Sequence, residues 1–187
     1  MKITPTAIPE VLVLEPQVYG DERGFFFESF NQRRFEELTG QRGHFVQDNH
    51  SRSARNVLRG LHYQIKQPQG KLVRVTSGAI FDVVVDLRRG SPTFGEWEAV
   101  ELDDVHGRQL WIPIGFGHGF CVLSEEADFV YKCTAYYDGA TEAGIRFDDP
   151  DVGVEWPGDI ELLYSERDRT APRLSEVADE LPFAYGT

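Results

Sequence analysis

The run Leu58–Gln64 places a histidine, His62, inside an apolar segment typical of a β-strand. Gly60 lies two residues earlier and favours a β-bulge, a feature that is frequent beside active sites. In a regular strand Arg59 and His62 face opposite sides of the sheet, whereas a bulge at Gly60 turns both toward one pocket. A buried carboxylate beside the imidazole fixes its tautomer and raises its basicity. Asp168, which we expect on a loop near the chain end, is the candidate carboxylate for such a proton-transfer pair.

Two further residues have a structural and a functional interpretation, and the sequence leaves both open. Tyr131 shares a strand face with apolar neighbours, so it is either a core tyrosine or a proton donor set in a hydrophobic wall. His118 lies in a glycine-rich turn that suits either a tight corner or close approach by a ligand. His62 taken alone could likewise be a core histidine. The chain has no His-x-His pair, and metal sites in small β-barrels need several such ligands, so we expect no metal.

Composition limits the classes of function. The chain has 187 residues, which suits one domain with a sizeable core. Its net charge of −12 argues against nucleic-acid binding, although a local arginine cluster can still bind a small anion. No apolar run approaches the roughly 20 residues that span a bilayer, and the N-terminus lacks the apolar core of a secretory signal. Cys121 and Cys133 are expected to be buried free thiols. We therefore expect a cytoplasmic protein with no membrane or nucleic-acid partner.

The elements that must position these residues are mainly strands. One helix is predicted from Asn31, a capping residue, to Gly40, and a second over Leu174–Leu181. The predicted strands are bounded by Gly, Pro, Asp or Asn. They are Val11–Leu14, Gly24–Phe30, Phe45–Ser51, Val57–Gln64, Lys71–Ser77, Ala79–Leu87, Trp97–Leu102, Gln109–Ile112, Gly119–Leu123, Phe129–Tyr136 and Gly144–Phe147. Many short strands separated by turns indicate an all-β sandwich, jelly roll or barrel.

An ordered set of motifs along nearly the whole chain resembles the dTDP-4-dehydrorhamnose 3,5-epimerase family. The motifs are Gly20-Asp21-Glu22-Arg23-Gly24-Phe25, Gln47-Asp48-Asn49, Arg59-Gly60-Leu61-His62-Tyr63-Gln64, Gly70-Lys71-Leu72-Val73-Arg74-Val75, Ser91-Pro92-Thr93-Phe94-Gly95, Trp111-Ile112-Pro113, Gly117-His118-Gly119-Phe120, Tyr131-Lys132 and Glu155-Trp156-Pro157. The resemblance implies a cupin-type jelly roll with short peripheral helices, acting without metal or redox cofactor, usually as a homodimer. Residues 1–187 would form one epimerase domain whose N-terminal strands and C-terminal tail pack on the barrel or on the dimer partner.

The same resemblance implies a substrate and roles for individual residues. The substrate would be a dTDP-4-keto-6-deoxyhexose, whose ketone acidifies the carbons C3 and C5. His62 would be the base, oriented by Asp168, with Tyr131 as the opposing proton donor and Lys71 near the C4 oxygen. Asp82, on a neighbouring strand, is our own candidate for orienting Lys71. The residues implied in substrate binding are Arg23, Glu28, Gln47, Asp48, Asn49, Arg59, His118, Glu142 and Arg167.

Some details depart from the family pattern or stay open. The family commonly has lysine where Arg167 stands, which keeps the charge but changes its geometry. Asp48 should point away from Gln47 and Asn49 on its strand, and Arg23 and Glu28 could act in the partner subunit's site. The predicted activity is 3,5-epimerisation in dTDP-L-rhamnose biosynthesis. The alternatives are a mono-epimerase that inverts only C3 or only C5, a cupin that only binds a nucleotide sugar, and, least favoured, a metal-dependent cupin.

Overall fold

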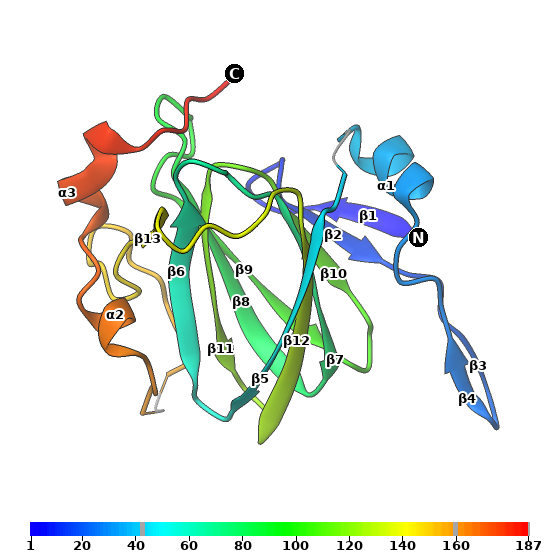
Figure 1. The fold of residues 1–187 in the computed structure, drawn as a ribbon. Helices are drawn as coiled ribbons and strands as arrows, with labels where there is room; N and C mark the ends of the chain where they lie inside the picture. Colours follow the sequence, from blue (N-terminus) through cyan, green and yellow to red (C-terminus); the bar gives the residue numbers. More distant parts are fainter. Residues whose placement is uncertain (42–43, 159–160, 187) are drawn as a thin grey trace.

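Two facing antiparallel sheets form a barrel in this computed structural model, which describes residues 1–41, 44–158 and 161–186 (Figure 1). One sheet has the order β1-β2-β10-β7-β12-β5, the other has the order β13-β6-β11-β8-β9, and β3 and β4 form a separate hairpin. The strands are β1 (Lys2–Pro5), β2 (Leu12–Glu15), β3 (Tyr19–Asp21), β4 (Gly24–Phe26), β5 (Gln47–Ala54), β6 (Leu58–Gln64), β7 (Lys71–Ser77), β8 (Ala79–Asp86), β9 (Trp97–Asp103), β10 (Gln109–Ile112), β11 (Phe116–Val122), β12 (Glu126–Cys133) and β13 (Glu142–Gly144). The predicted all-β jelly-roll architecture is confirmed.

The main core lies between the sheets, and each sheet is also covered on its outer face. In β8, Val84 faces the core between the sheets, whereas Val83 and Val85 face an outer apolar cluster under the C-terminal segment. Because β8 is buried on both faces, its polar residues Asp82 and Asp86 are buried too, and each is hydrogen-bonded. The face of β8 that carries Asp82, Val84 and Asp86 is therefore an interior face.

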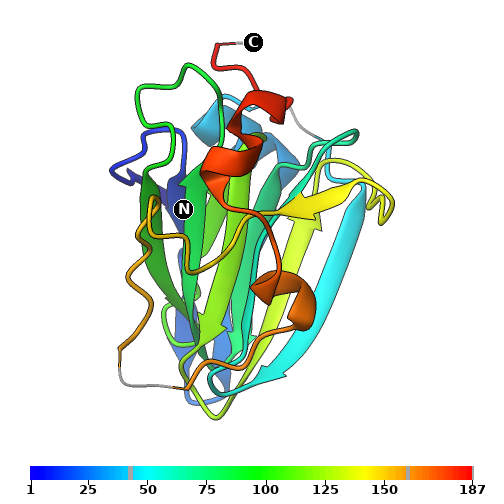
Figure 2. The ribbon, with the colours of Figure 1, turned by 90° about the vertical axis from the view of Figure 1, so that its left-hand side faces the viewer.

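The helices lie outside the barrel. The predicted first helix is confirmed as α1 (Gln32–Thr39): the Asn31 side chain accepts a hydrogen bond from the Arg34 amide, and Gly40 ends the helix with φ 70°. The second predicted helix is shorter, as α3 (Leu174–Val177) followed by the 3₁₀ helix η1 (Ala178–Glu180). Figure 2 shows α3 and the unpredicted helix α2 (Glu166–Arg169) crossing the outside of the five-stranded sheet. None of the helices within the described residues is both long and apolar enough to cross a bilayer.

Several strand limits differ from the predicted ones for local reasons. β4 ends at Phe26 because Glu28 already accepts hydrogen bonds from the start of α1. β12 ends at Cys133 rather than Tyr136, because the chain then turns away and the Tyr137 amide donates to the Gln47 side chain. β1 and β3 were missed, since short edge strands carry little alternation to read.

A bulge in β6 brings this strand unusually close to β11. His62 lies opposite His118, and Arg59 lies opposite Phe120. Between these two pairs β6 therefore contains one residue more than β11. The predicted bulge is thus confirmed, and it turns Arg59 and His62 to the same side. A side chain at Gly60, where φ is +125°, would lie 2.5 Å from the Cα of Gly119. Only two facing glycines allow this approach.

Adding one methyl group at this contact should destabilise the protein strongly. The Cβ of Gly119→Ala would lie 2.7 Å from the Arg59 carbonyl oxygen and 3.1 Å from the Gly60 Cα, which are backbone atoms that cannot move alone. We expect a loss of about 3 kcal/mol in the free energy of unfolding, measured by urea denaturation. Gly158→Ala, with no neighbour within 4 Å, is the control and should change stability by less than about 0.5 kcal/mol. Equal effects would contradict the close-packing argument.

The turn after β8 should make stability depend on pH. Asp86 accepts hydrogen bonds from Arg88, Ser91 and Thr93, and these outweigh burial, which raises its pKa, so the pKa of Asp86 lies below its usual value. Ionised Asp86 therefore stabilises the fold above the unfolded-state pKa of about 3.9, and this contribution disappears as the pH falls through the folded-state pKa.

Asp86→Asn leaves the buried Arg88 guanidinium without its main partner, so we expect a loss of about 3 kcal/mol at pH 7. The difference from the parent should shrink as the pH falls from about 4 toward the lower folded-state pKa, because Asp86 of the unfolded chain is protonated first. Asp148→Asn removes the exposed pair with Arg146 and should cost less than about 1 kcal/mol. A gap between parent and Asp86→Asn that is constant from pH 7 to pH 3 would contradict this assignment.

Candidate active site

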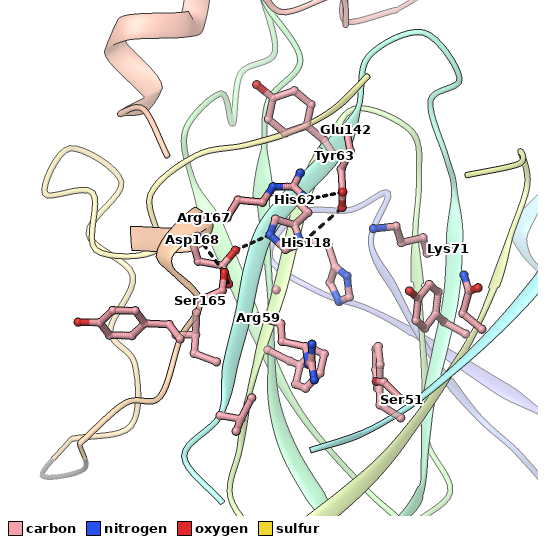
Figure 3. Close-up of a pocket in the computed structure, with 18 of the residues that line it drawn as sticks. Ser51, Arg59, His62, Tyr63, Lys71, His118, Glu142, Ser165, Arg167 and Asp168 are labelled. Atoms are coloured by element: carbon pink, nitrogen blue, oxygen red, sulfur yellow. Dashed lines mark hydrogen bonds and ion pairs between the residues drawn. The ribbon is translucent and has the colours of Figure 1, made fainter. Parts of the chain in front are cut away.

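Many polar residues of the sequence motifs line one cavity of about 730 Å³ between the two sheets, a size that suits a small-molecule ligand. One wall comes from β6 and β11 of the five-stranded sheet together with α2, and the other from β5, β7 and β12. Figure 3 shows His62, Asp168, Glu142 and Arg167 on one side of this cavity and Lys71 on the other. The predicted site residues that line it are Asn49, Arg59, His62, Lys71, His118, Tyr131, Glu142, Arg167 and Asp168.

His62 and Asp168 form the predicted pair although they are far apart in the sequence. The Nε2 of His62 lies 2.6 Å from Oδ1 of Asp168. A carboxylate accepts hydrogen bonds, so the Nε2 atom carries the proton and Nδ1 of the neutral ring has the free lone pair. The imidazole is therefore arranged to take up a proton at Nδ1.

Asp168 lies on α2 and not on a loop, and it is buried, with 4% of its surface exposed. Burial raises the pKa of Asp168, but the hydrogen bonds from His62 and Ser165 outweigh burial and hold it below its usual value. The carboxylate is therefore ionised at neutral pH. An ionised Asp168 stabilises the imidazolium that forms when His62 accepts a proton.

The facing wall carries a proton donor and a cation. Burial raises the pKa of Tyr131, and Cys133 and Glu142 raise it further, so the phenol keeps its proton at neutral pH. Burial lowers the pKa of Lys71, opposed by Cys133, Glu142 and Asp82. No carboxylate in the described part of the chain forms an ion pair with Lys71. Its amino group is thus free to contact an anionic ligand atom, whose negative charge would favour the ammonium form.

His118 forms a second histidine–carboxylate pair deeper in the same wall. Its Nε2 lies 3.0 Å from both carboxylate oxygens of Asp82, and both residues are buried. Burial lowers the pKa of His118 and raises that of Asp82, which pushes both toward their uncharged forms. We expected Asp82 to orient Lys71, but its hydrogen-bond partner is His118.

Glu142 connects the base to the mouth of the cavity. Its Oε1 lies 3.9 Å from Nδ1 of His62, and its Oε2 accepts hydrogen bonds from Tyr137 and Arg167. Burial raises the pKa of Glu142, but Arg167, Tyr137 and His62 outweigh it and keep the pKa below its usual value. The mouth therefore holds an anionic group whose partners come from two different segments.

The remaining predicted binding residues lie outside the cavity lining. Gln47 donates to the Asn49 side chain at 2.9 Å, so it contacts a lining residue. Asp48 points away, as its strand position predicts, and pairs with Lys132. Arg23 lies on the β3–β4 hairpin paired with Asp21, and Glu28 accepts from Asn31 at the start of α1.

Two residues that contact the site were not singled out from the sequence. Ser165 lies three residues before Asp168, a spacing typical of a helix N-cap, and this signal could have found both Ser165 and α2. Tyr137 carries no such signal, because only the folded turn brings its hydroxyl 2.8 Å from Glu142. Within the described ranges, no cluster of three or more His, Cys, Asp or Glu residues is placed to hold a metal ion.

The arrangement suits removal of a proton from carbon next to a carbonyl group. One wall offers an imidazole base, the other offers a protonated phenol, and a lysine ammonium can stabilise an oxyanion between them. A proton taken on one face of a ring and returned on the other inverts the carbon.

Comparison with known proteins agrees with this chemistry. The family model of dTDP-4-dehydrorhamnose 3,5-epimerase matches residues 5–176. The dTDP-4-dehydrorhamnose 3,5-epimerase of Pseudomonas aeruginosa is 57% identical over 177 residues, covering 95% of this chain and 98% of the relative. The dTDP-4-dehydrorhamnose 3-epimerase of Streptomyces niveus is 43% identical, covering 96% of this chain and 86% of that protein.

A solved structure is similar over the full length. The crystal structure of dTDP-6-deoxy-D-glucose-3,5-epimerase from Legionella pneumophila, in complex with dTDP-4-keto-L-rhamnose, has a TM-score of 0.97 and 52% sequence identity. The match covers 100% of this chain and 99% of that one. Sequence, fold and cavity therefore agree: the chain belongs to the dTDP-4-dehydrorhamnose 3,5-epimerase family.

Proposed function

We propose that the protein is an isomerase that epimerises dTDP-4-dehydro-6-deoxy-D-glucose at C3 and C5, giving dTDP-4-dehydro-L-rhamnose for dTDP-L-rhamnose biosynthesis. One observation carries the proposal: His62, held by Asp168, lies in the same cavity as Tyr131 and the unpaired Lys71, with base and acid on facing walls. The match to the family over residues 5–176 supports the substrate class.

The residues divide the proton transfer between them. Nδ1 of His62 takes the proton from the carbon beside the C4 ketone, and the electron pair of the broken C–H bond moves to the C4 oxygen, giving an enolate. Lys71 stabilises the negative charge on that oxygen. Tyr131 then donates its phenolic proton to the opposite face of the same carbon, and the C4 carbonyl re-forms. Solvent restores the proton of Tyr131 and removes that of His62 before the next inversion.

The electrostatics of the cavity suit these roles. A proton donor must hold its proton until the enolate forms, and burial raises the pKa of Tyr131 accordingly. An enolate needs a cation that is not already neutralised, and Lys71 has no ion-pair partner among the described residues. When His62 accepts the proton its ring becomes positively charged, and the carboxylate of Asp168 stabilises that charge.

A mono-epimerase is the second candidate function. It would use the same base, acid and cation, and the relative from Streptomyces niveus is named a 3-epimerase at 43% identity. The two activities therefore differ in which carbons exchange hydrogen, and not in the base, acid or cation. A cupin that only binds nucleotide sugars would not need a base and an acid on facing walls.

We also propose a homodimer in which the hairpin of one subunit completes the cavity of the other. The β3–β4 hairpin projects from the barrel and exposes Tyr19, Phe25 and Phe26 by 64%, 70% and 71% (Figure 1). Exposed aromatic side chains in this density mark a protein interface. β5, which carries Asn49, is an edge strand of its sheet and offers free backbone groups beside the cavity. Arg23 and Glu28 would then act in the partner's site.

A cytoplasmic location agrees with this activity. Cys121 and Cys133 are both free and buried, and thiols stay reduced in the cytoplasm.

Exchange of the sugar's carbon-bound hydrogens tests the activity directly. The protein is incubated with dTDP-4-keto-6-deoxyglucose in heavy water, and deuterium at C3 and C5 is followed by NMR. We expect exchange at both carbons. Exchange at one carbon alone would establish a mono-epimerase, and no exchange by a folded protein that binds the nucleotide would overturn the enzymatic proposal.

Variants of the base and the acid should separate the two proton transfers. His62→Ala is expected to lower the exchange rate at both carbons by at least about 10³-fold, since the imidazole that takes the proton is removed. Tyr131→Phe should lower product formation more than it lowers hydrogen loss from the substrate, because the enolate still forms and is reprotonated poorly. A His62→Ala variant that exchanges at the parent rate would remove this mechanism.

Mixing two inactive variants tests whether the hairpin acts in the partner's site. In a heterodimer of His62→Ala and Arg23→Ala subunits, one of the two sites has an intact base and an intact Arg23 only if Arg23 is supplied by the other subunit. Unfolding and refolding the two together should therefore restore about a quarter of the parent activity by random pairing. No recovery, with heterodimers present in the mixture, would show that Arg23 acts within its own subunit or not at all.

A further inference from the structure

We propose that Ser165 is a positioning residue for the catalytic base: its hydroxyl fixes the carboxylate of Asp168 and, through it, the imidazole of His62. The inference rests on the proposed function, since it assigns Ser165 a part in the same proton transfer. Ser165 lines the cavity beside Asp168, and Figure 3 shows the three side chains in line.

One hydroxyl group makes two hydrogen bonds to the same residue. Oγ of Ser165 donates to Oδ2 of Asp168 at 2.8 Å and accepts from the Asp168 backbone amide at 3.1 Å. The other carboxylate oxygen, Oδ1, accepts from Nε2 of His62 at 2.6 Å. With Oδ2 held by Ser165, the plane of the carboxylate is set, and Oδ1 is aimed at the imidazole. Ser165 thus acts on His62 without touching the substrate's reacting carbon.

The partner of Oδ2 is neutral, and this matters for the base. The two arginines that flank Asp168 are paired elsewhere: Arg167 donates to Glu142, and Arg169 donates to Glu166. Within the described residues, no lysine or arginine forms an ion pair with Asp168. A cation at Oδ2 would orient the carboxylate but also neutralise the charge that stabilises the imidazolium. A hydroxyl orients the carboxylate and leaves its charge to His62.

Burial makes this bond hard to replace. Asp168 is 4% exposed, so an oxygen that loses its protein donor cannot turn freely into bulk water. In Ser165→Ala the carboxylate should rotate between orientations, and the fraction of enzyme with a correctly aimed His62 should fall. A hydrogen bond to a charged group commonly contributes enough to change a rate about tenfold, so we expect kcat to fall about tenfold while KM changes less than twofold.

The same hydroxyl also caps α2, so the test must separate capping from orientation. Ser165→Thr keeps both hydrogen bonds and should restore kcat to within about twofold of the parent. Ser165→Asp keeps a good capping residue, but its carboxylate cannot donate to Oδ2 and repels it, so its kcat should fall at least as far as that of Ser165→Ala. Thermal unfolding of each variant reports the loss of the cap independently of the rate.

Ser124→Ala is the matched control. The Ser124 hydroxyl accepts a hydrogen bond from the Ala79 amide at 2.9 Å and donates one to the Glu126 carbonyl at 2.6 Å. It therefore makes two hydrogen bonds as Ser165 does, but it does not line the cavity. This substitution should lower the melting temperature and leave kcat unchanged.

The pH profile gives a second readout. Ser165 is among the groups that lower the pKa of Asp168, so its loss raises that pKa. Asp168 and His62 are hydrogen-bonded to each other, so the acidic limb of kcat/KM belongs to the pair. In Ser165→Ala this limb should move toward higher pH relative to the parent, and Ser165→Thr should move it back. Ser165→Ala with parent kcat and an unmoved acidic limb, in an active parent enzyme, would overturn the inference and leave the proposed function intact. A parent enzyme without exchange activity would instead overturn the proposed function.

Discussion

The close approach of β6 and β11 at Gly60 and Gly119 is the constraint on which the site depends. Because neither residue has a side chain, the strands come together over a bulge, and the extra residue in β6 changes which side chains face inward. Arg59 and His62 consequently both face the cavity. Without the bulge one of them would face the outer apolar cluster, where a charged or basic group has no partner.

The side chains of Tyr131, Asp168 and Lys71 are partly or largely buried in the cavity, and the groups that contact each of them decide how its pKa shifts. Tyr131 has little to oppose burial, so its pKa rises and it stays a proton donor. Asp168 has two hydrogen-bond donors that outweigh burial, so it stays ionised. Burial lowers the pKa of Lys71, and among the described residues it forms no ion pair, so its amino group stays free to contact a developing oxyanion. Tyr131 and Asp168 thus keep different protonation states within one cavity because their hydrogen-bond partners differ, and not because one is more deeply buried.

The C-terminal segment has a role in the active site as well as in the packing of the fold. Leu174, Leu181 and Phe183 pack in the outer apolar cluster with Leu61 and Tyr63, the neighbours of His62 in β6. This packing holds the segment against the outside of the same strand whose inner face carries the base (Figure 2). α2 can therefore reach around the edge of the sheet and present Asp168. Stability of the tail and alignment of the base are coupled through that one strand.

The sequence by itself determined the strand-rich fold, the first helix with its two caps, the bulge at Gly60 and the residue types of the active site. The strands, the helix and the bulge rest on local patterns, namely alternation, capping residues and glycine positions, which act over a few residues of chain. The active-site residues follow instead from the ordered motifs that resemble the family. The sequence also placed Asp48 on the far side of its strand, since alternation is local too. Only the tertiary structure decided that Asp168 reaches His62 from a distant segment, that Asp82 binds His118, and that the Tyr137 hydroxyl contacts Glu142. The physical reason is that hydrogen-bond partners far apart in the chain are selected by sheet pairing and by burial, which no local pattern records.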